Sequence, residues 1–327
     1  MKRLFFTILC CFICLTAYMQ DKPEWQDETI PFVGKEYPRT PFMTYGDIDK
    51  ARDNDFKASA DYKSLNGKWK FLWVSTYKKR PINFYKTDFN DSGWEEIEVP
   101  ANWEVNGYGV ALYTNHPYEF CPRNPQPPLL PEENPVGSYR KYFELPEQWD
   151  GKEIFLHIGA VKSGCYLYVN GTKVGYNEDS KDPVEYNITR YLKPGQNLIA
   201  LEVYRWSTGS YLECQDFWRI SGIERDVYLF AQSPVHPWDF SIRQDLDSSY
   251  TNGLFGLDLT LVNKNPKQPG QITVRYQLES PSGTRVAEGQ KIVNVDSIAR
   301  VHFDTTIPQV EAWTAETPHL YQLFIQI

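Results

Sequence analysis

The stretch Tyr166–Tyr176, YLYVNGTKVGY, indicates how this chain folds. Apolar and polar residues alternate on both sides of the Asn170-Gly171 pair, as they do in a half-buried strand. A type I′ turn requires a positive φ angle at both central residues, and Asn-Gly is the pair that favours it most strongly. The stretch therefore predicts two antiparallel strands joined by a tight turn.

Similar strand patterns lie before and after this hairpin, and a Pro194-Gly195 turn separates two of them. No amphipathic segment of 10 to 15 residues, the usual length of a crossover helix, comes between them. The order favours an antiparallel sandwich or jelly roll over an α/β fold. The predicted strands lie within residues 65–74, 138–145, 152–161, 197–206 and 225–232.

A second all-β domain is expected after the proline-rich segment SPVHPWDF, residues 233–240. Alternation resumes at Phe255, Ile272 and Tyr321, and we expect about seven short strands, as in an immunoglobulin-like sandwich. The Cys…Trp…Cys spacing of antibody domains is absent from the sequence. The predicted fold class is all-β, with a jelly roll over 61–233 and an immunoglobulin-like domain over 234–327.

The first 20 residues resemble an export signal, because Lys2 and Arg3 precede an uncharged apolar run that is short for a bilayer span. We expect a cleaved signal peptide over 1–20 and a periplasmic or extracellular protein that is free of the membrane afterwards. An uncleaved anchor is one alternative. A lipoprotein is less favoured, since none of Cys10, Cys11 and Cys14 follows the usual small residue. Residues 21–60 lack a sustained period and predict an extended lead-in over a domain surface.

Charge and cysteine content exclude some classes of protein. Removing Lys2 and Arg3 changes the formal net charge from −8 to −10, and such a surface repels nucleic acid. The cysteines beyond the signal, Cys121, Cys165 and Cys214, are odd in number and widely spaced. They indicate neither a disulfide scaffold nor a zinc site. The formation of one disulfide between two of them after export is an alternative that the sequence does not decide.

Five phrases, in this order, resemble the front of family 2 β-galactosidases. The resemblance covers about Asp47 to Ile327, and VEAWTAETPHLYQL, residues 310–323, is similar to the family's close of its immunoglobulin-like domain. The phrases are SLNGKWKF (64–71), VPANWEVNGYGVALYTNHPYEF (99–120), NPVGSYRKYF (134–143), YVNGTKVGYNEDSKDPVEYNIT (168–189) and RWSTGSYLECQDFWRISGIERDVYLF (205–230).

The resemblance implies a jelly-roll sugar-binding domain and an immunoglobulin-like domain, followed in the family by a catalytic (β/α)₈ barrel. Retaining glycosidases use two carboxyl groups about 5 to 5.5 Å apart, and in the family both belong to barrel glutamates. No residue here corresponds to either, so no catalytic residue is assigned and this chain alone is expected to be inactive. Its strands run to the last residue, where the barrel is expected to begin.

The resemblance also implies the site residues. The matching Asp is Asp216, a galactose contact and a possible ligand of a monovalent cation, and the matching Asn is Asn115, a second sugar contact. This chain by itself is expected to need no cofactor, whereas Na⁺ or K⁺ and Mg²⁺ are implied for the complete enzyme. The implied partners are a β-galactoside, the catalytic barrel and further copies of the chain in a homo-oligomer.

Other residues of 206–230 are interpreted as structural. Trp206, Trp218 and Arg219 are expected to shape loops, because tryptophan in a β-sandwich more often packs in the core than against a sugar. Glu213 is expected to hold its loop against the sandwich. Two alternatives to a β-galactosidase front stay open: a stand-alone galactose-binding module, and part of another family 2 glycosidase such as β-glucuronidase or β-mannosidase.

Overall fold

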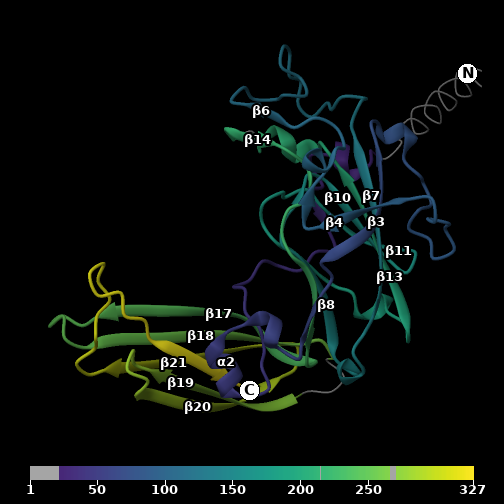
Figure 1. Cartoon of the computed structure of the whole chain (residues 1–327). Coiled ribbons are helices and arrows are strands. Elements are labelled where there is room, and N and C mark those ends of the chain that lie inside the picture. Colours follow the sequence, from purple (N-terminus) through teal and green to yellow (C-terminus); the bar gives the residue numbers. More distant parts are fainter. Residues whose placement is uncertain (1–21, 214, 266–269) are drawn as a thin grey trace, which may run out of the picture.

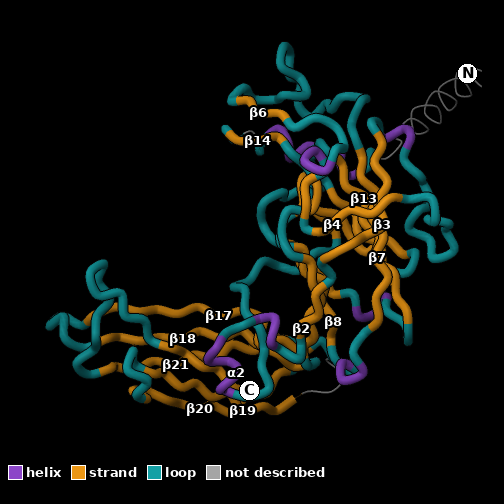
Figure 2. The backbone as a smooth tube through the Cα atoms, viewed as in Figure 1, coloured by secondary structure: helices purple, strands orange, loops and turns teal. Residues whose placement is uncertain are grey.

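The computed structural model describes residues 22–213, 215–265 and 270–327, so the expected signal peptide lies outside the described residues. Two lobes of β-structure make up the described chain (Figure 1). The first lobe contains strands β1 to β16 and the second contains β17 to β22. Helices are few and short beside the strands (Figure 2). The predicted all-β class is confirmed.

Two antiparallel sheets form the jelly roll. Their neighbour orders are β1-β11-β10-β13-β7-β3-β4 and β12-β8-β16-β2. The strands of the larger sheet are β1 (Phe32–Val33), β3 (Gly67–Val74), β4 (Glu95–Val99), β7 (Val136–Glu144), β10 (Cys165–Val169), β11 (Thr172–Asn177) and β13 (Gln196–Tyr204). The strands of the smaller sheet are β2 (Tyr62–Ser64), β8 (Glu153–Ile158), β12 (Val184–Asn187) and β16 (Val227–Gln232).

The hairpin predicted from Asn170-Gly171 is present. Strand β10 pairs with β11 from Cys165 opposite Asn177 to Val169 opposite Thr172. Asn170 and Gly171 have φ angles of 49° and 87°, so both adopt the left-handed conformation that this turn requires. The local sequence therefore fixes the pairing of β10 with β11, two neighbouring strands of the larger sheet.

The core of the jelly roll lies between the two sheets. Alternate residues of β3, such as Trp69 and Phe71, are 1% exposed and point into it. The outer face of the larger sheet is covered as well, because Trp25 of the lead-in stacks on Tyr204 with ring centroids 4.7 Å apart. Coverage on both faces explains why β13 is buried from Asn197 to Tyr204.

Two small sheets extend the jelly roll. One joins β5 (Ala101–Asn102), β15 (Gly222–Ile223) and β9 (Val161–Lys162), and the other pairs β6 (Leu112–Thr114) with β14 (Phe217–Arg219). The β6–β14 ribbon lies at the end of the jelly roll that is farthest from the second lobe (Figure 1). The proline-rich chain from residue 115 to 135 contains no helix or strand.

The second lobe is a sandwich of two three-stranded sheets, β17-β18-β21 and β20-β19-β22. Six strands are described rather than about seven, and five of them have 10 to 12 residues, because the alternation runs on without turn residues. Pro237 is tolerated in β17 because that strand is an edge and shifts register at this point. The strands are β17 (Val235–Leu246), β18 (Gly253–Asn263), β19 (Gly270–Glu279), β20 (Arg285–Val295), β21 (Ile298–Ile307) and β22 (Gln322–Gln326).

The lead-in contacts both lobes. It is not extended throughout, because it contains the short helix α2 (Ile48–Asp53). Asp47 caps the start of this helix by accepting a hydrogen bond from the Lys50 N–H at 2.9 Å, and Asn54 ends it at a φ of 48°. The 3₁₀ turns are η1 (Glu24–Gln26), η2 (Phe56–Ala58), η3 (Tyr77–Lys79), η4 (Glu104–Asn106), η5 (Glu147–Trp149), η6 (Thr189–Tyr191) and η7 (Thr208–Tyr211).

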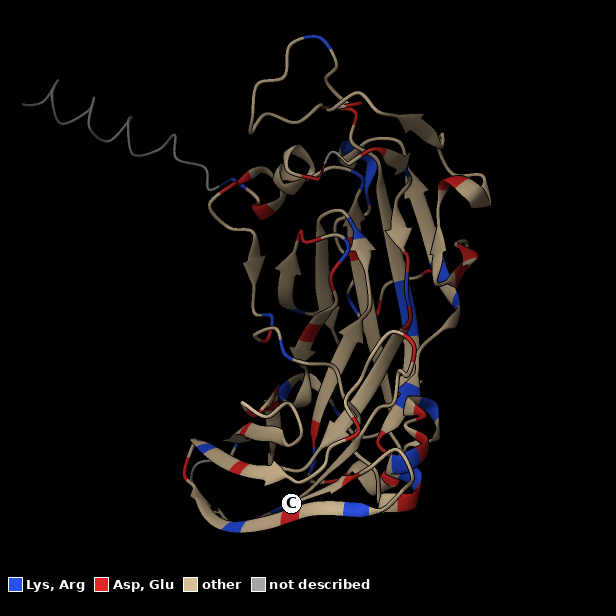
Figure 3. Ribbon diagram, turned by 90° about the vertical axis from the view of Figure 1, so that its left-hand side faces the viewer, with Lys and Arg blue, Asp and Glu red and all other residues tan. Residues whose placement is uncertain are grey.

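Charged residues of both signs are interspersed over the two lobes (Figure 3). Among the described residues, no helix is long and apolar enough to cross a membrane. Cys121 and Cys165 are free thiols, whereas Cys214 lies outside the described residues, so the expectation of one disulfide stays a prediction.

Candidate functional site

The two residues proposed to contact sugar come together at one end of the β6–β14 ribbon. Phe217 pairs with Thr114, and Asp216 precedes Phe217 while Asn115 follows Thr114. Asp216 and Asn115 therefore stand opposite each other, one step beyond the paired residues. Both are exposed.

The outer face of the ribbon combines polar groups with aromatic rings. Side chains two residues apart on a strand share a face, so Asp216 and Trp218 point the same way, and so do Asn115 and Tyr113. The Tyr113 hydroxyl donates to Asp216 Oδ1 at 3.3 Å, and the Tyr113 and Trp218 rings lie 5.6 Å apart. A carboxylate, an amide and a phenol can accept and donate hydrogen bonds to sugar hydroxyls.

The inner face of the ribbon is anchored in charged surroundings. Arg219 is 2% exposed, and its Nε lies 3.6 Å from Glu119 Oε2 in the proline-rich segment. Its Nη1 donates to the Glu213 carbonyl at 3.4 Å. The Phe217 ring lies 5.1 Å from the Nζ of Lys162, which is buried.

Glu213 holds its loop as expected. Its Oε1 accepts from the Ser180 backbone N–H at 2.8 Å, and its Oε2 accepts from the Ser180 hydroxyl. Burial raises the pKa of this carboxyl, and the bonds from Ser180 act against that rise. These contacts hold the loop, as the structural interpretation of Glu213 expects.

The three residues interpreted as loop-shaping behave differently. Trp206 is half-buried and donates from Nε1 to Glu119 Oε1 at 3.1 Å, so it does brace the proline-rich segment. Arg219 is buried beside the same glutamate. The interpretation of Trp218 as a packing residue is wrong, because its side chain is 54% exposed on the outer face. Sequence alternation from Asp216 was the signal that placed Trp218 on that face.

Tyr113 and Glu119 were not singled out from the sequence. Tyr113 is 61% exposed and touches both Asp216 and Trp218. Its position two residues before Asn115 was a signal, but it became informative only once β6 was known to be a strand. The sequence next to Glu119 does not indicate its role, because its partners Trp206 and Arg219 lie 87 and 100 residues further along the chain.

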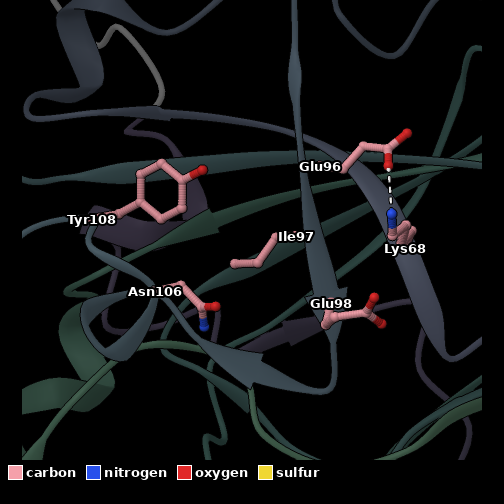
Figure 4. Close-up of a pocket in the computed structure, with 6 residues that line it drawn as sticks. All are labelled: Lys68, Glu96, Ile97, Glu98, Asn106 and Tyr108. Carbon is pink, nitrogen blue, oxygen red and sulfur yellow. Dashed lines mark ion pairs between the residues drawn. The ribbon is translucent and has the colours of Figure 1, made fainter.

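Two hollows in the surface lie elsewhere and contain neither Asn115 nor Asp216. One of about 230 Å³ runs along the edge strand β4 (Figure 4). It is smaller than the pockets of roughly 300 to 1,000 Å³ that bind small molecules. Its lining residues are Lys68, Glu96, Ile97, Glu98, Asn106 and Tyr108. The other, of about 530 Å³, lies between Pro41 of the lead-in and Tyr228 of β16.

Within residues 22–213, 215–265 and 270–327, no three His, Cys, Asp or Glu residues are grouped so that they could hold a metal ion. At the ribbon this chain offers one carboxylate, Asp216, with the Tyr113 hydroxyl beside it. Alkali ions prefer several hard oxygen ligands. The donor set fits part of a monovalent cation site, and the remaining ligands would have to come from outside this chain.

Comparison with known proteins agrees with this division of the chain. Residues 62–234 match the profile described as "Glycosyl hydrolases family 2, sugar binding domain", and residues 235–327 match "Glycosyl hydrolases family 2". A β-galactosidase of Priestia megaterium is 36% identical over 317 residues, which are 95% of this chain and 31% of that protein. One of Halalkalibacterium halodurans is 39% identical over 266 residues, 81% of this chain and 26% of that protein.

Solved structures share the fold. A β-glucuronidase of Bacteroides uniformis superposes with a TM-score of 0.66 at 22% identity, covering 81% of this chain and 30% of that one. A β-glycosidase of Bacteroides vulgatus has a TM-score of 0.62 at 23% identity, with coverages of 82% and 32%.

A jelly roll joined to an immunoglobulin-like sandwich, with no (β/α)₈ barrel among the described residues, defines the accessory β-domains of a multidomain glycosidase. The chain belongs to glycosyl hydrolases family 2. It spans less than a third of the length of the two curated relatives.

Proposed function

We propose that this chain is the non-catalytic front of an exported family 2 β-galactosidase, which hydrolyses terminal non-reducing β-D-galactose residues with retention. The observation that carries the proposal is the pairing of Phe217 with Thr114, which sets Asp216 beside Asn115 on an exposed ribbon. The curated relatives at 36% and 39% identity, both β-galactosidases, support galactose as the sugar.

In this proposal the ribbon forms one wall of a sugar site. Asp216 accepts hydrogen bonds from galactose hydroxyls, and Asn115 accepts or donates through its amide. Neither residue is consumed, because the reaction itself needs a pair of carboxyl groups that a catalytic barrel supplies. Asp216 also contributes one oxygen to a monovalent cation whose other ligands lie outside this chain.

One wall is too little for tight binding. The loss of rigid-body freedom on association costs about 4 kcal/mol or more, and the few hydrogen bonds that Asp216 and Asn115 offer do not exceed it. The isolated chain is therefore expected to bind free galactose negligibly. Tight galactose binding that depends on Asp216 would instead identify a stand-alone galactose-binding module.

A β-glucuronidase is the second candidate, since solved β-glucuronidases share this fold. At 22 and 23% identity they support the fold and not the substrate. A glucuronide carries a carboxylate, which Asp216 would repel at close range. The galactosidase proposal is therefore favoured.

The test is a chimera in which this chain replaces the matching front of the Priestia megaterium β-galactosidase. Asp216→Asn should lower kcat/KM on an aryl β-galactoside by roughly 10- to 150-fold, the worth of about 1.5 to 3 kcal/mol for a hydrogen bond to a charged group. Asn115→Ala should lower it less, because its bonds are neutral. The control is Asp182→Asn, which changes an exposed acid of the same domain that is not on the ribbon.

Two results would reject the proposal. One is a chimera that cleaves aryl β-glucuronides in preference to β-galactosides. The other is a chimera in which Asp216→Asn and Asp182→Asn have the same kcat/KM as the unchanged protein.

A further inference from the structure

We propose that Arg219 and Glu119 are positioning residues, which hold the β6–β14 ribbon so that Asp216 stays beside Asn115. The importance of these two residues for sugar binding rests on the proposed function. The fixing of the ribbon itself rests only on contacts within this chain.

The need for an anchor follows from the size of the ribbon. Each strand has three residues, and the two pair only with each other. An isolated two-stranded ribbon is marginally stable in water even when it is much longer. Its outer residues Tyr113 and Trp218 are 61% and 54% exposed, so their packing provides little to hold it. The order must come from the inner face.

Arg219 supplies that inner contact. The side chain is almost fully buried, and it lies between two segments that flank the ribbon. Its Nη1 bonds to the carbonyl of Glu213 in the segment before β14, and its Nε faces Glu119 in the segment after β6. One guanidinium therefore ties together the chain entering β14 and the chain leaving β6.

Glu119 extends the tie into the jelly roll. Its Oε1 accepts from Trp206 Nε1 at 3.1 Å, while its Oε2 faces Arg219. The Trp206 backbone N–H in turn donates to Asn134 Oδ1 at 3.0 Å. Glu119 thus connects the ribbon to residues that directly follow the central strand β13.

The tie between Arg219 and Glu119 is an attraction of charges rather than a hydrogen bond. Their nearest atoms are 3.6 Å apart, and Arg219 Nε and Nη2 have no hydrogen-bond partner among the described residues. Buried charges interact strongly because water does not screen them. Loss of the Glu119 charge leaves Arg219 buried without the carboxylate it faces, which is a large penalty, whereas loss of Arg219 leaves Glu119 with the attraction of Lys162 and Arg205.

Phe217 adds a second anchor beside Asp216. Three cations surround its ring, with Lys162 Nζ at 5.1 Å, Lys181 Nζ at 5.2 Å and the Arg219 guanidinium carbon at 5.5 Å from the ring centroid. Cations over a ring face are attracted to it, more so when they are desolvated. Phe217 and Arg219 share the inner face, so Asp216 and Trp218 are held on the outer face.

The test follows ribbon order in the protein as it is, with no sugar present. Nuclear Overhauser contacts between the Tyr113 and Trp218 rings, whose centroids lie 5.6 Å apart, report the closed ribbon. We expect Arg219→Met to abolish these contacts and Arg219→Lys to keep them, since lysine retains the charge. The matched control is Arg243→Met, which removes an exposed ion pair with Asp258 in the second lobe.

Glu119→Gln serves where Arg219→Met fails to fold. The glutamine oxygen still accepts from Trp206, so only the charge opposite Arg219 is lost. The ring contacts should therefore weaken at least twofold, and the thermal midpoint of the jelly roll should fall as well, because Arg219 stays buried without the opposite charge. Ring contacts of native intensity in Glu119→Gln overturn the proposal. Because no sugar enters this readout, a failure of the galactosidase proposal is recognised separately in the chimera.

Discussion

Arg39 of the lead-in forms a two-point ion pair with Glu185 of the jelly roll, from Nε to Oε2 at 2.9 Å and from Nη2 to Oε1 at 3.1 Å. The guanidinium also lies over the rings of Phe230 in the first lobe and Trp238 in the second. One residue after Arg39, the Thr40 N–H donates to Asp239 of β17. The lead-in therefore contacts both sandwiches within two residues.

Arg39→Ala is expected to lower the free energy of unfolding by about 3 kcal/mol, because it leaves the Glu185 carboxylate largely buried without its guanidinium partner. Denaturant unfolding measures the change. The control is Arg285→Ala, which breaks an ion pair whose side chains are 54% and 65% exposed and should cost less than about 1 kcal/mol. Equal effects of the two substitutions would show that Arg39 does not join the lobes.

Purified residues 21–327 should release no chromophore from an aryl β-galactoside. The reason is that no pair of carboxyl groups in this chain was assigned as acid and nucleophile, and retaining hydrolysis needs both. An assay against a complete family 2 β-galactosidase at equal molar concentration measures it. Activity that survives purification and disappears when an acid of this chain is changed would contradict the expectation.

His236 should make folding weaker in mild acid. Burial lowers its pKa from 6.5 to about 4, and its Nδ1–H donates to the Ser233 carbonyl at 2.7 Å. The folded state therefore holds the neutral ring. Its contribution to stability is complete above pH 6.5 and is lost as the pH falls toward 4.

The loss between pH 7.5 and pH 5 is expected to be about 2 kcal/mol at 1.36 kcal/mol per pKa unit. Urea unfolding across that range measures it. His236→Asn keeps a donor for Ser233 but does not titrate, so its stability should vary less with pH.

His302 should show the opposite sign. Its Nδ1 lies 2.7 Å from Asp258 Oδ1 and its Nε2 contacts Asp304, and these hydrogen bonds raise its pKa above 6.5 even though Arg243 lies nearby. Its contribution is present below the unfolded pKa and is lost as the pH rises through the folded pKa.

Proton NMR titration of the His302 ring measures this pKa directly. Asp258→Asn should lower it, because the carboxylate that favours the imidazolium is removed. Salt at about 1 M should lower it as well, since the cluster is exposed and charges are screened beyond roughly 3 Å at that concentration. A His302 pKa at or below 6.5 would contradict the assignment.

The sequence by itself determined the elements that depend on local rules. Asn170-Gly171 fixed a hairpin because few residue pairs accept two positive φ angles. Alternation at Trp69 and Phe71 fixed a strand and its buried face, because side chains alternate along a strand. Asp47 and Asn54 are also residue types that favour the two ends of a helix, and they cap α2. The polar segment around them has no apolar periodicity, so the helix was not predicted.

The tertiary structure decided the site. Asn115 and Asp216 are 101 positions apart, and only the pairing of β6 with β14 places them side by side. Trp218 is exposed although tryptophan in a sandwich usually packs inside, because its strand has one open face. Contacts such as Arg39 with Glu185 and Arg219 with Glu119 depend on how distant segments pack, and no local pattern encodes that distance.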